Sequence, residues 1–310
     1  MAVNMKGKDL ISIADLTLEE IYEIFDVAHS LKQKLYTNEP HRYLEGKTLG
    51  MIFTKRSTRT RVSFETGIYQ LGGLGMYFGP NDLQLGKSES IADTARVLSR
   101  YLNGIMIRTF DHNDVVELAK YADIPVINGL TDLLHPCQVL TDLFTVLEKK
   151  RKLQGLKLAY IGDGNNMAHS LLNGCSKVGM NIAIASPSGY KPNKDIVANA
   201  KKFAAYMGSK VEILDDPVAA VKNADIVYTD VWASMGQEEE AEERKKKFAR
   251  FQVNPKLVKH AKEDYLFMHC LPAHRGEEVV DEVADSPNSV IFDEAENRLH
   301  VQKAIMALVM

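Results

Sequence analysis

The sequence is poor in cysteine and has no long hydrophobic run. Its three cysteines, Cys137, Cys175 and Cys270, are widely spaced and odd in number, which argues against a disulfide framework and for a reducing compartment. No stretch approaches the roughly 20 apolar residues that cross a bilayer, and the first six residues lack the apolar core of a secretion signal. We therefore expect a soluble, cytoplasmic protein with no membrane partner.

The sequence also lacks a large excess of either charge. Its 38 Lys and Arg against 41 Asp and Glu give a formal net charge of −3. This balance excludes a nucleic-acid partner bound by bulk phosphate attraction, so any bound anion must be held by a local group of donors. A length of 310 residues with 45% hydrophobic content is sufficient for two domains.

Short β-rich runs alternate with helical patterns from about residue 47 onward. This alternation predicts an α/β fold of two domains, each a mostly parallel sheet flanked by helices. The strands are expected at 48–53, 75–78, 105–107 and 125–127 in the first half, and at 157–161, 181–185, 211–214, 226–228 and 265–268 in the second.

A helix over residues 138–151 is expected to connect the two sets of strands. We place one domain at 1–150 and the other at 151–293, and we expect a final helix over about 294–310 to pack back on the first domain. Ligands of open α/β sheets bind beyond the carboxyl ends of the strands, so the polar residues that follow each strand are the candidates for a site.

The residues after the first strand have the composition of a phosphate site. Ser57 is a natural N-cap, and Thr58, Arg59, Thr60 and Arg61 follow it within the first turn of an expected helix. The segment thus combines hydroxyl and guanidinium donors with the unpaired backbone N–H groups of a helix start, and all of these can bind a phosphate. The alternative is a capped helix with solvated arginines. The string is not a P-loop, because it has no Gly-x-x-x-x-Gly-Lys-Ser/Thr pattern.

Two further donor groups follow later strands of the first half. Arg108 comes directly after the strand at 105–107, and His135 and Gln138 stand between a loop and a helix. Alone, Arg108 is equally a surface charge and His135 a structural hydrogen-bonder. Beside a phosphate site they become candidate donors to a carbonyl oxygen.

The second half contains a glycine pattern, Gly162-Asp163-Gly164, that invites a dinucleotide interpretation. The third glycine position is Met167 and no acid follows the next strand, so the pattern argues against NAD. Asn165 and Asn166 would instead hold a carboxylate with uncharged donors. Asp230, at the end of another strand, suits a ligand ammonium.

Two other segments have simple interpretations. The charged run at 238–247 predicts a solvated helix with ion pairs between residues four apart. His269, Cys270 and His274 suggest zinc, but their spacing does not match structural zinc sites and there is no Cys-x-x-Cys pair, so we expect no metal.

Five motifs in order resemble the aspartate/ornithine carbamoyltransferase family. They are the string Phe53 to Arg61, Leu85-Gly86-Lys87-Ser88-Glu89-Ser90, His135-Pro136-Cys137-Gln138, Asp230 to Gly236, and His269-Cys270-Leu271-Pro272-Ala273. The last two resemble the ornithine branch of the family, and together the motifs span nearly the whole chain.

The resemblance implies transfer of the carbamoyl group from carbamoyl phosphate to the δ-amine of L-ornithine, giving L-citrulline and phosphate. It implies an active site in the cleft between the domains and no metal or organic cofactor. The expected catalytic residues are Thr60, Arg108, His135, Asp230 and Cys270. Those expected to bind carbamoyl phosphate are Ser57, Thr58, Arg59, Thr60, Gln84, Arg108, His135, Gln138, Cys270, Leu271 and Arg298; those expected to bind ornithine are Asn165, Asn166, Asp230, Ser234 and Met235.

The resemblance also implies a homo-oligomer, a trimer or a multiple of trimers with shared sites. In the family, the loop that contains Gln84 reaches a neighbouring subunit, and Lys87 is a second candidate for that role. The loop around Gly236 would close over the substrate as a lid.

Several alternatives remain open from the sequence. The acceptor is ornithine, N-acetylornithine, putrescine or aspartate, although aspartate would call for basic groups and putrescine would not require the Ser234-Met235-Gly236 loop. A non-catalytic module that binds carbamoyl phosphate is the other possibility, but every proposed catalytic position has a competent side chain. The sequence does not separate arginine synthesis from arginine breakdown.

Overall fold

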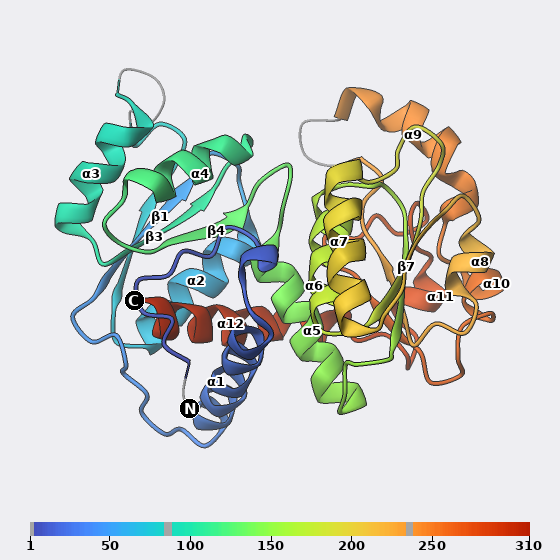
Figure 1. Cartoon of the computed structure of the whole chain (residues 1–310), viewed down its shortest axis with the longest axis horizontal. Helices are drawn as coiled ribbons and strands as arrows, with labels where there is room; N and C mark the ends of the chain where they lie inside the picture. The colour runs from blue at the N-terminus through green and yellow to red at the C-terminus, as the bar shows by residue number, and fades with distance from the viewer. Residues whose placement is uncertain (1–2, 84–88, 234–237) are drawn as a thin grey trace. The chain divides into compact units, whose positions relative to one another are not determined.

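The computed structural model describes residues 3–83, 89–233 and 238–310, and the chain forms two compact units. The first unit is Met1–Thr141 with Glu296–Met310, and the second is Asp142–Ala295. Each unit has one parallel sheet with helices on its faces, as the alternation of patterns predicted (Figure 1). The division falls inside helix α5 (Pro136–Lys150) and again near the start of the last helix.

The sheet of the first unit has the order β2-β1-β3-β4, with all strands parallel. The strands are β1 (Thr48–Phe53), β2 (Leu74–Phe78), β3 (Gly104–Arg108) and β4 (Val126–Leu130). Every expected strand of this half is therefore confirmed. Because β1 and β3 are neighbours, their last residues, Phe53 and Arg108, are paired in register. Arg108 thus lies at the strand edge where the segment leading to Ser57 begins.

Helices cover both faces of this sheet. On one face, α3 (Ile91–Tyr101) and α4 (His112–Tyr121) bury Leu98 and Val115 against Ile105 and its neighbours. On the other face lie α2 (Thr58–Gln70) and α12 (Ile291–Val309), as Figure 1 shows. A Cβ atom at Gly67 of α2 would stand 2.9 Å from the Met306 side chain, so these two helices pack closely.

The first long helix, α1 (Leu18–Tyr36), was not among the sequence expectations. It begins at a capping box in which Thr17 and Glu20 each bond the backbone N–H of the other. Among the residues described, none of the helices combines the length and the apolar character needed to cross a bilayer.

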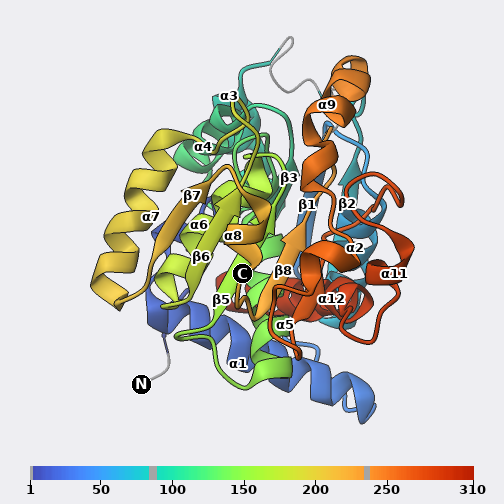
Figure 2. The same cartoon turned by 90° about the vertical axis from the view of Figure 1, so that its right-hand side faces the viewer.

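The sheet of the second unit has the order β7-β6-β5-β8-β9, again all parallel (Figure 2). The strands are β5 (Lys157–Ile161), β6 (Asn181–Ala185), β7 (Val211–Leu214), β8 (Ile226–Thr229) and β9 (Leu266–Met268), which confirms the strands expected here. Because β5 pairs with both β6 and β8, the strand order reverses at β5, and ligands of such sheets bind at this point. The segments after Ile161 and Thr229 start side by side, since these two residues are in register.

Two sets of helices flank the second sheet. Helices α6 (Asn166–Lys177) and α7 (Lys194–Met207) lie side by side on one face (Figure 1). The other face packs against α8 (Pro217–Val221), α10 (Pro255–Val258) and α11 (Asp281–Ala284). Helix α9 (Ala241–Phe248) and the short 3-10 helices Ile13–Asp15, Glu238–Glu240 and Ala249–Phe251 complete the described elements.

Candidate functional site

The first candidate cluster is built on the N-terminus of α2. The Ser57 hydroxyl accepts a hydrogen bond from the Thr60 backbone N–H at 3.2 Å, so Ser57 caps the helix as predicted. No acidic residue lies in the first turn. Thr58 is exposed and Arg59 is half-buried there. This helix start therefore presents backbone N–H groups, hydroxyls and a positive charge to an anion.

Two guanidinium groups converge on the Thr60 hydroxyl. Arg108 donates to Thr60 Oγ1 from Nη1 at 3.2 Å, and Arg298 donates to the same oxygen from Nη2 at 2.8 Å. Arg298 also donates from Nη1 to Gln138 Oε1. All four side chains are buried, so these two cations lie side by side with little solvent screening. The structure thus brings together Thr60, Arg108, Gln138 and Arg298, which are far apart in the sequence.

His135 belongs to the same cluster and is kept neutral. Burial lowers the pKa of His135 well below its ordinary value, and the charges of Arg298, Arg108 and Arg59 lower it further. A neutral imidazole beside three cations can donate one hydrogen bond without adding a fourth positive charge. The role predicted for His135, a donor to a carbonyl oxygen, is compatible with this state.

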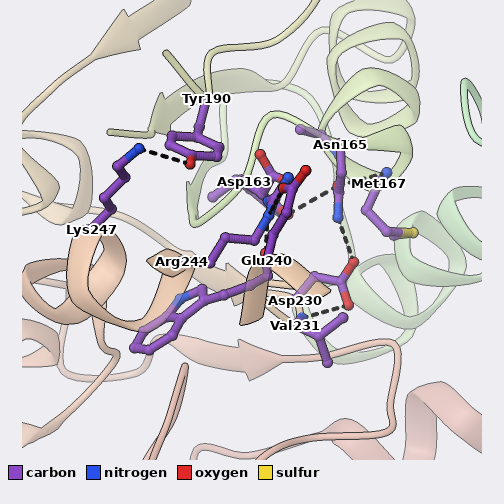
Figure 3. Close-up of polar contacts among 12 residues, drawn as sticks. Asp163, Asn165, Met167, Tyr190, Asp230, Val231, Glu240, Arg244 and Lys247 are labelled. Carbon is purple, nitrogen blue, oxygen red and sulfur yellow. Dashed lines mark hydrogen bonds and ion pairs between the residues drawn. The ribbon is translucent and has the colours of Figure 1, made fainter. Parts of the chain in front are cut away.

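The second candidate cluster surrounds Asp230, which follows β8 directly. Its Oδ1 accepts the Val231 backbone N–H at 2.8 Å and the Cys270 thiol at 3.1 Å. Its Oδ2 accepts the Asn165 amide at 2.8 Å, and Figure 3 shows Asn165 pointing toward this carboxylate. Asp230, the acid predicted to bind an ammonium, is 6% exposed. Its carboxylate is held by donors from two neighbouring segments at the sheet edge and from the loop that contains Cys270.

Cys270 acts in this cluster as a protonated thiol. Burial raises the pKa of Cys270 well above its ordinary value, and the negative charges of Asp230 and Glu294 raise it further. The next residue, Leu271, has a left-handed backbone (φ 58°) and precedes a cis peptide bond to Pro272. The Leu271 backbone N–H donates to His269 Nδ1 at 2.9 Å, so the loop that presents Cys270 and Leu271 is tied to a buried histidine.

A metal at this loop does not fit the bonds that are present. One ligand atom each of Asp230, His269 and Cys270 lies within 4.8 Å of the others. However, both ring nitrogens of His269 are occupied, Nδ1 by Leu271 and Nε2 by Glu278 at 3.2 Å, and the Cys270 thiol donates to Asp230. Metal binding would require a deprotonated thiol and a free imidazole nitrogen.

The Gly162-Asp163-Gly164 pattern has a packing explanation. Gly162 has φ 149°, and a Cβ atom at Gly164 would stand 2.2 Å from the backbone nitrogen of Pro192. The Gly164 N–H donates to the Tyr190 carbonyl at 2.8 Å. Gly164 is therefore required for close approach of two loops, so the pattern does not need a dinucleotide to explain it. Asn166, the first residue of α6, is half-buried.

Five of the predicted functional residues lie outside the described part of the chain. They are Gln84 and Lys87 in the loop expected to reach a neighbouring subunit, and Ser234, Met235 and Gly236 in the loop expected to act as a lid. Their roles stay predictions.

The interpretation of the charged run at 238–247 was wrong at Arg244. The pairs Arg244–Glu240 and Lys247–Glu243 have the expected spacing of four residues. Arg244, however, is only 6% exposed, and its Nη1 donates to Asp163 at 2.8 Å and to the Trp232 carbonyl at 2.9 Å (Figure 3). The reason is that Asp163 is buried after β5, where its charge needs a partner.

Arg244 is thus a residue at the site edge that the sequence analysis missed. Burial raises the pKa of Asp163, and the charge and hydrogen bond of Arg244 oppose that rise. Arg244 connects the loop after β5 to Trp232, two residues beyond Asp230. The local sequence offered no signal of this, because Arg244 stands among acids and lysines that are exposed.

Replacing Arg244 by methionine is expected to lower the free energy of unfolding by about 3 to 5 kcal/mol, since it leaves Asp163 buried without a cation. Denaturation by guanidinium, followed by the fluorescence of the single tryptophan, Trp232, measures this loss. The double variant Asp163→Asn/Arg244→Met removes both charges and is expected to recover most of it. A loss below about 1 kcal/mol in Arg244→Met would show that the pair is worth no more than a surface ion pair.

The fold and the two clusters define an α/β protein of the group-transfer class. One unit brings two buried guanidiniums together beside a neutral histidine, and the other brings a buried carboxylate together with a thiol. Residues 8–148 match the model of the carbamoyl-P binding domain of aspartate/ornithine carbamoyltransferase, and residues 154–309 match the model of its Asp/Orn binding domain. The chain belongs to the aspartate/ornithine carbamoyltransferase family.

Individual relatives agree with this assignment over the full length. The chain is 62% identical over 310 residues to an ornithine carbamoyltransferase of Thermococcus kodakarensis, covering 100% of this chain and 98% of that protein. The structure of the ornithine carbamoyltransferase from Pyrococcus furiosus matches with a TM-score of 0.97 at 59% identity, covering 99% of this chain and 98% of the other. The enzyme from Thermus thermophilus matches with a TM-score of 0.87 at 38% identity, covering 98% and 99%.

Proposed function

We propose that the protein transfers the carbamoyl group of carbamoyl phosphate to the δ-amine of L-ornithine, giving L-citrulline and phosphate. The observation that carries the proposal is the convergence of Arg108 and Arg298 on Thr60, beside a histidine that burial keeps neutral. A substrate with a phosphate and a carbonyl oxygen fits such a group of donors. The relatives named ornithine carbamoyltransferase support ornithine as the acceptor.

In this proposal the first unit binds carbamoyl phosphate. Ser57, Thr58, Arg59 and Arg298 hold the phosphate at the start of α2, and Gln138 holds the carbamoyl NH2 group. Thr60, Arg108 and His135 donate hydrogen bonds to the carbonyl oxygen, where negative charge develops when the amine attacks. The C–O bond to the phosphate then breaks, and the departing phosphate takes up the proton lost by the attacking nitrogen. The nearby guanidiniums stabilise its charge.

The second unit binds ornithine and prepares its amine. An alkyl ammonium with a pKa near 10.4 has no lone pair, so the site must favour the neutral δ-amine. Desolvation disfavours the charged form, and Asp230, Cys270 and the Leu271 carbonyl orient the amine hydrogens. Asn166, Asp230, Ser234 and Met235 hold the amino-acid end, and Asn165 lies beside Asp230.

We also infer a homo-oligomer in the cytoplasm that works in arginine synthesis. Tyr69 of α2 and Leu74 of the edge strand β2 are 78% and 61% exposed, and exposed apolar side chains beside a sheet edge support a subunit contact. The three free thiols support a reducing compartment. A Pyrococcus furiosus relative, 59% identical, is named the anabolic enzyme, which supports the direction of citrulline synthesis.

An acceptor screen tests the proposed function. Carbamoyl phosphate is offered with ornithine, N-acetylornithine, putrescine or aspartate while phosphate release is followed, and ornithine is expected to be the preferred acceptor. Preference for another amine would show that ornithine is not the acceptor substrate. The absence of heat when carbamoyl phosphate is titrated into the folded protein would reject the assignment altogether.

A further inference from the structure

The Asn165 side chain is bonded to four groups of the second unit. Its Oδ1 accepts the backbone N–H groups of Met167 at 3.0 Å and Ala168 at 3.2 Å, and the Tyr160 hydroxyl at 3.2 Å. Its Nδ2 donates to Asp230 Oδ2 at 2.8 Å. Figure 3 shows the amide between the start of α6 and the Asp230 carboxylate.

These bonds leave the amide one possible orientation. Exchange of the two ends would place an NH2 group against two backbone N–H donors and an oxygen against a carboxylate, so three favourable contacts would become repulsive. The Tyr160 hydroxyl can donate to Oδ1 in this orientation, because burial and the charge of Asp230 raise the pKa of Tyr160 well above its ordinary value and keep the hydroxyl protonated. The cap of α6 therefore obliges Asn165 to present an N–H group to Asp230.

Asp230 in turn depends on Asn165 for one of its two oxygens. Oδ1 is bonded by the Val231 N–H and the Cys270 thiol, whereas among the described residues Asn165 is the donor to Oδ2. Donors on both oxygens prevent the carboxylate from rotating about its Cβ–Cγ bond. Without the Asn165 donor, the orientation of the Asp230 carboxylate toward an amine would no longer be fixed.

We propose that Asn165 is a positioning residue that acts through Asp230, by fixing the orientation of its carboxylate toward the amine groups of the substrate. This differs from the sequence prediction that Asn165 holds the substrate carboxylate. The inference rests on the proposed function, because it takes Asp230 to be the group that meets ornithine.

The variant Asn165→Ser tests this inference. Serine is a good N-cap, so the start of α6 stays capped, but its short side chain lacks the N–H donor to Asp230. We expect kcat/KM for ornithine to fall about 10- to 100-fold, the size of one lost hydrogen bond to a charged group. Calorimetry is expected to show an unchanged affinity for carbamoyl phosphate. Asn165→Asp, also a good cap, puts an acceptor against Asp230 and is expected to lose more.

Asn193→Ser is the matched control. Asn193 caps α7 through the same pair of bonds, from the N–H groups of Asp195 and Ile196, and it is exposed. We expect this variant to keep ornithine kinetics within about twofold, as is usual for a surface substitution. Equal unfolding midpoints of Asn165→Ser and Asn193→Ser would show that the cap of α6 is intact.

The double variant Asn165→Ser/Asp230→Asn separates a positioning role from direct substrate contact. If Asn165 acts through Asp230, adding Asn165→Ser to Asp230→Asn should reduce kcat/KM by less than about threefold, because interacting residues are non-additive. A full, additive loss would overturn the inference in favour of direct contact, as would Asn165→Ser kinetics equal to those of Asn193→Ser. Normal kinetics of Asp230→Asn alone would instead reject the proposed role of Asp230, and the inference with it.

Discussion

Replacing Arg108 by alanine is expected to reduce citrulline formation by about 10² to 10³-fold while the protein stays folded. Arg108 ends β3 beside the start of α2, and its guanidinium reaches the Thr60 hydroxyl at 3.2 Å. In the proposed mechanism it donates to the carbamoyl oxygen, where negative charge develops in the transition state. Loss of such a donor affects turnover more than binding of the ground state.

The Arg108→Ala result is checked by steady-state kinetics with both substrates. Arg96→Ala is a suitable control, because Arg96 is an exposed arginine of α3 that pairs with Asp93 and belongs to neither cluster. Its citrulline formation is expected to be near normal. If Arg108→Ala also formed citrulline at a near-normal rate, Arg108 would have no part in the chemistry.

Replacing Asp230 by asparagine is expected to weaken ornithine binding by about 2 to 3 kcal/mol, or roughly 30- to 150-fold, since a desolvated charge partner is lost. The carboxylate accepts hydrogen bonds from three described groups of its own unit and is 6% exposed. The Cys270 thiol beside it is protonated and neutral, so it does not replace the lost charge.

Equilibrium titration of each substrate separates the two clusters. Carbamoyl phosphate binding by Asp230→Asn is expected to change by less than about threefold, because the residues proposed to hold its phosphate group, Ser57, Thr58, Arg59 and Arg298, lie in the other unit. Equal losses of affinity for both substrates would show that the assignment of Asp230 to the ornithine-binding half of the site is wrong.

Much of the secondary structure followed from local pattern. Each expected strand is present because buried parallel strands are short, apolar and rich in β-branched residues, as at Ile226–Thr229. Ser57 was recognised as a cap from its position between a strand and a run of polar residues. The polar residues after the strands were also the correct places to look, since Arg108 and Asp230 are both at strand ends.

The contacts within the clusters could not be predicted in this way. Arg298 donates to Thr60 across 238 positions of the chain, and no local pattern relates the two. For Arg244 the local pattern was misleading. Its neighbours in the charged run are exposed, so the sequence gives no indication that Arg244 itself is buried against Asp163. The sheet orders likewise depend on which strands pair, and strand pairing is a property of the whole unit.

The sequence by itself determined the class of fold, the family and the identity of most chemically competent residues, because these depend on residue type and short-range spacing. Only the tertiary structure decided which donors meet: two guanidiniums at Thr60, a protonated thiol at Asp230, and an asparagine whose helix cap turns its N–H toward that acid. The physical reason is that burial and long-range hydrogen bonds determine the orientation and protonation of a side chain, and both arise only when distant segments pack together.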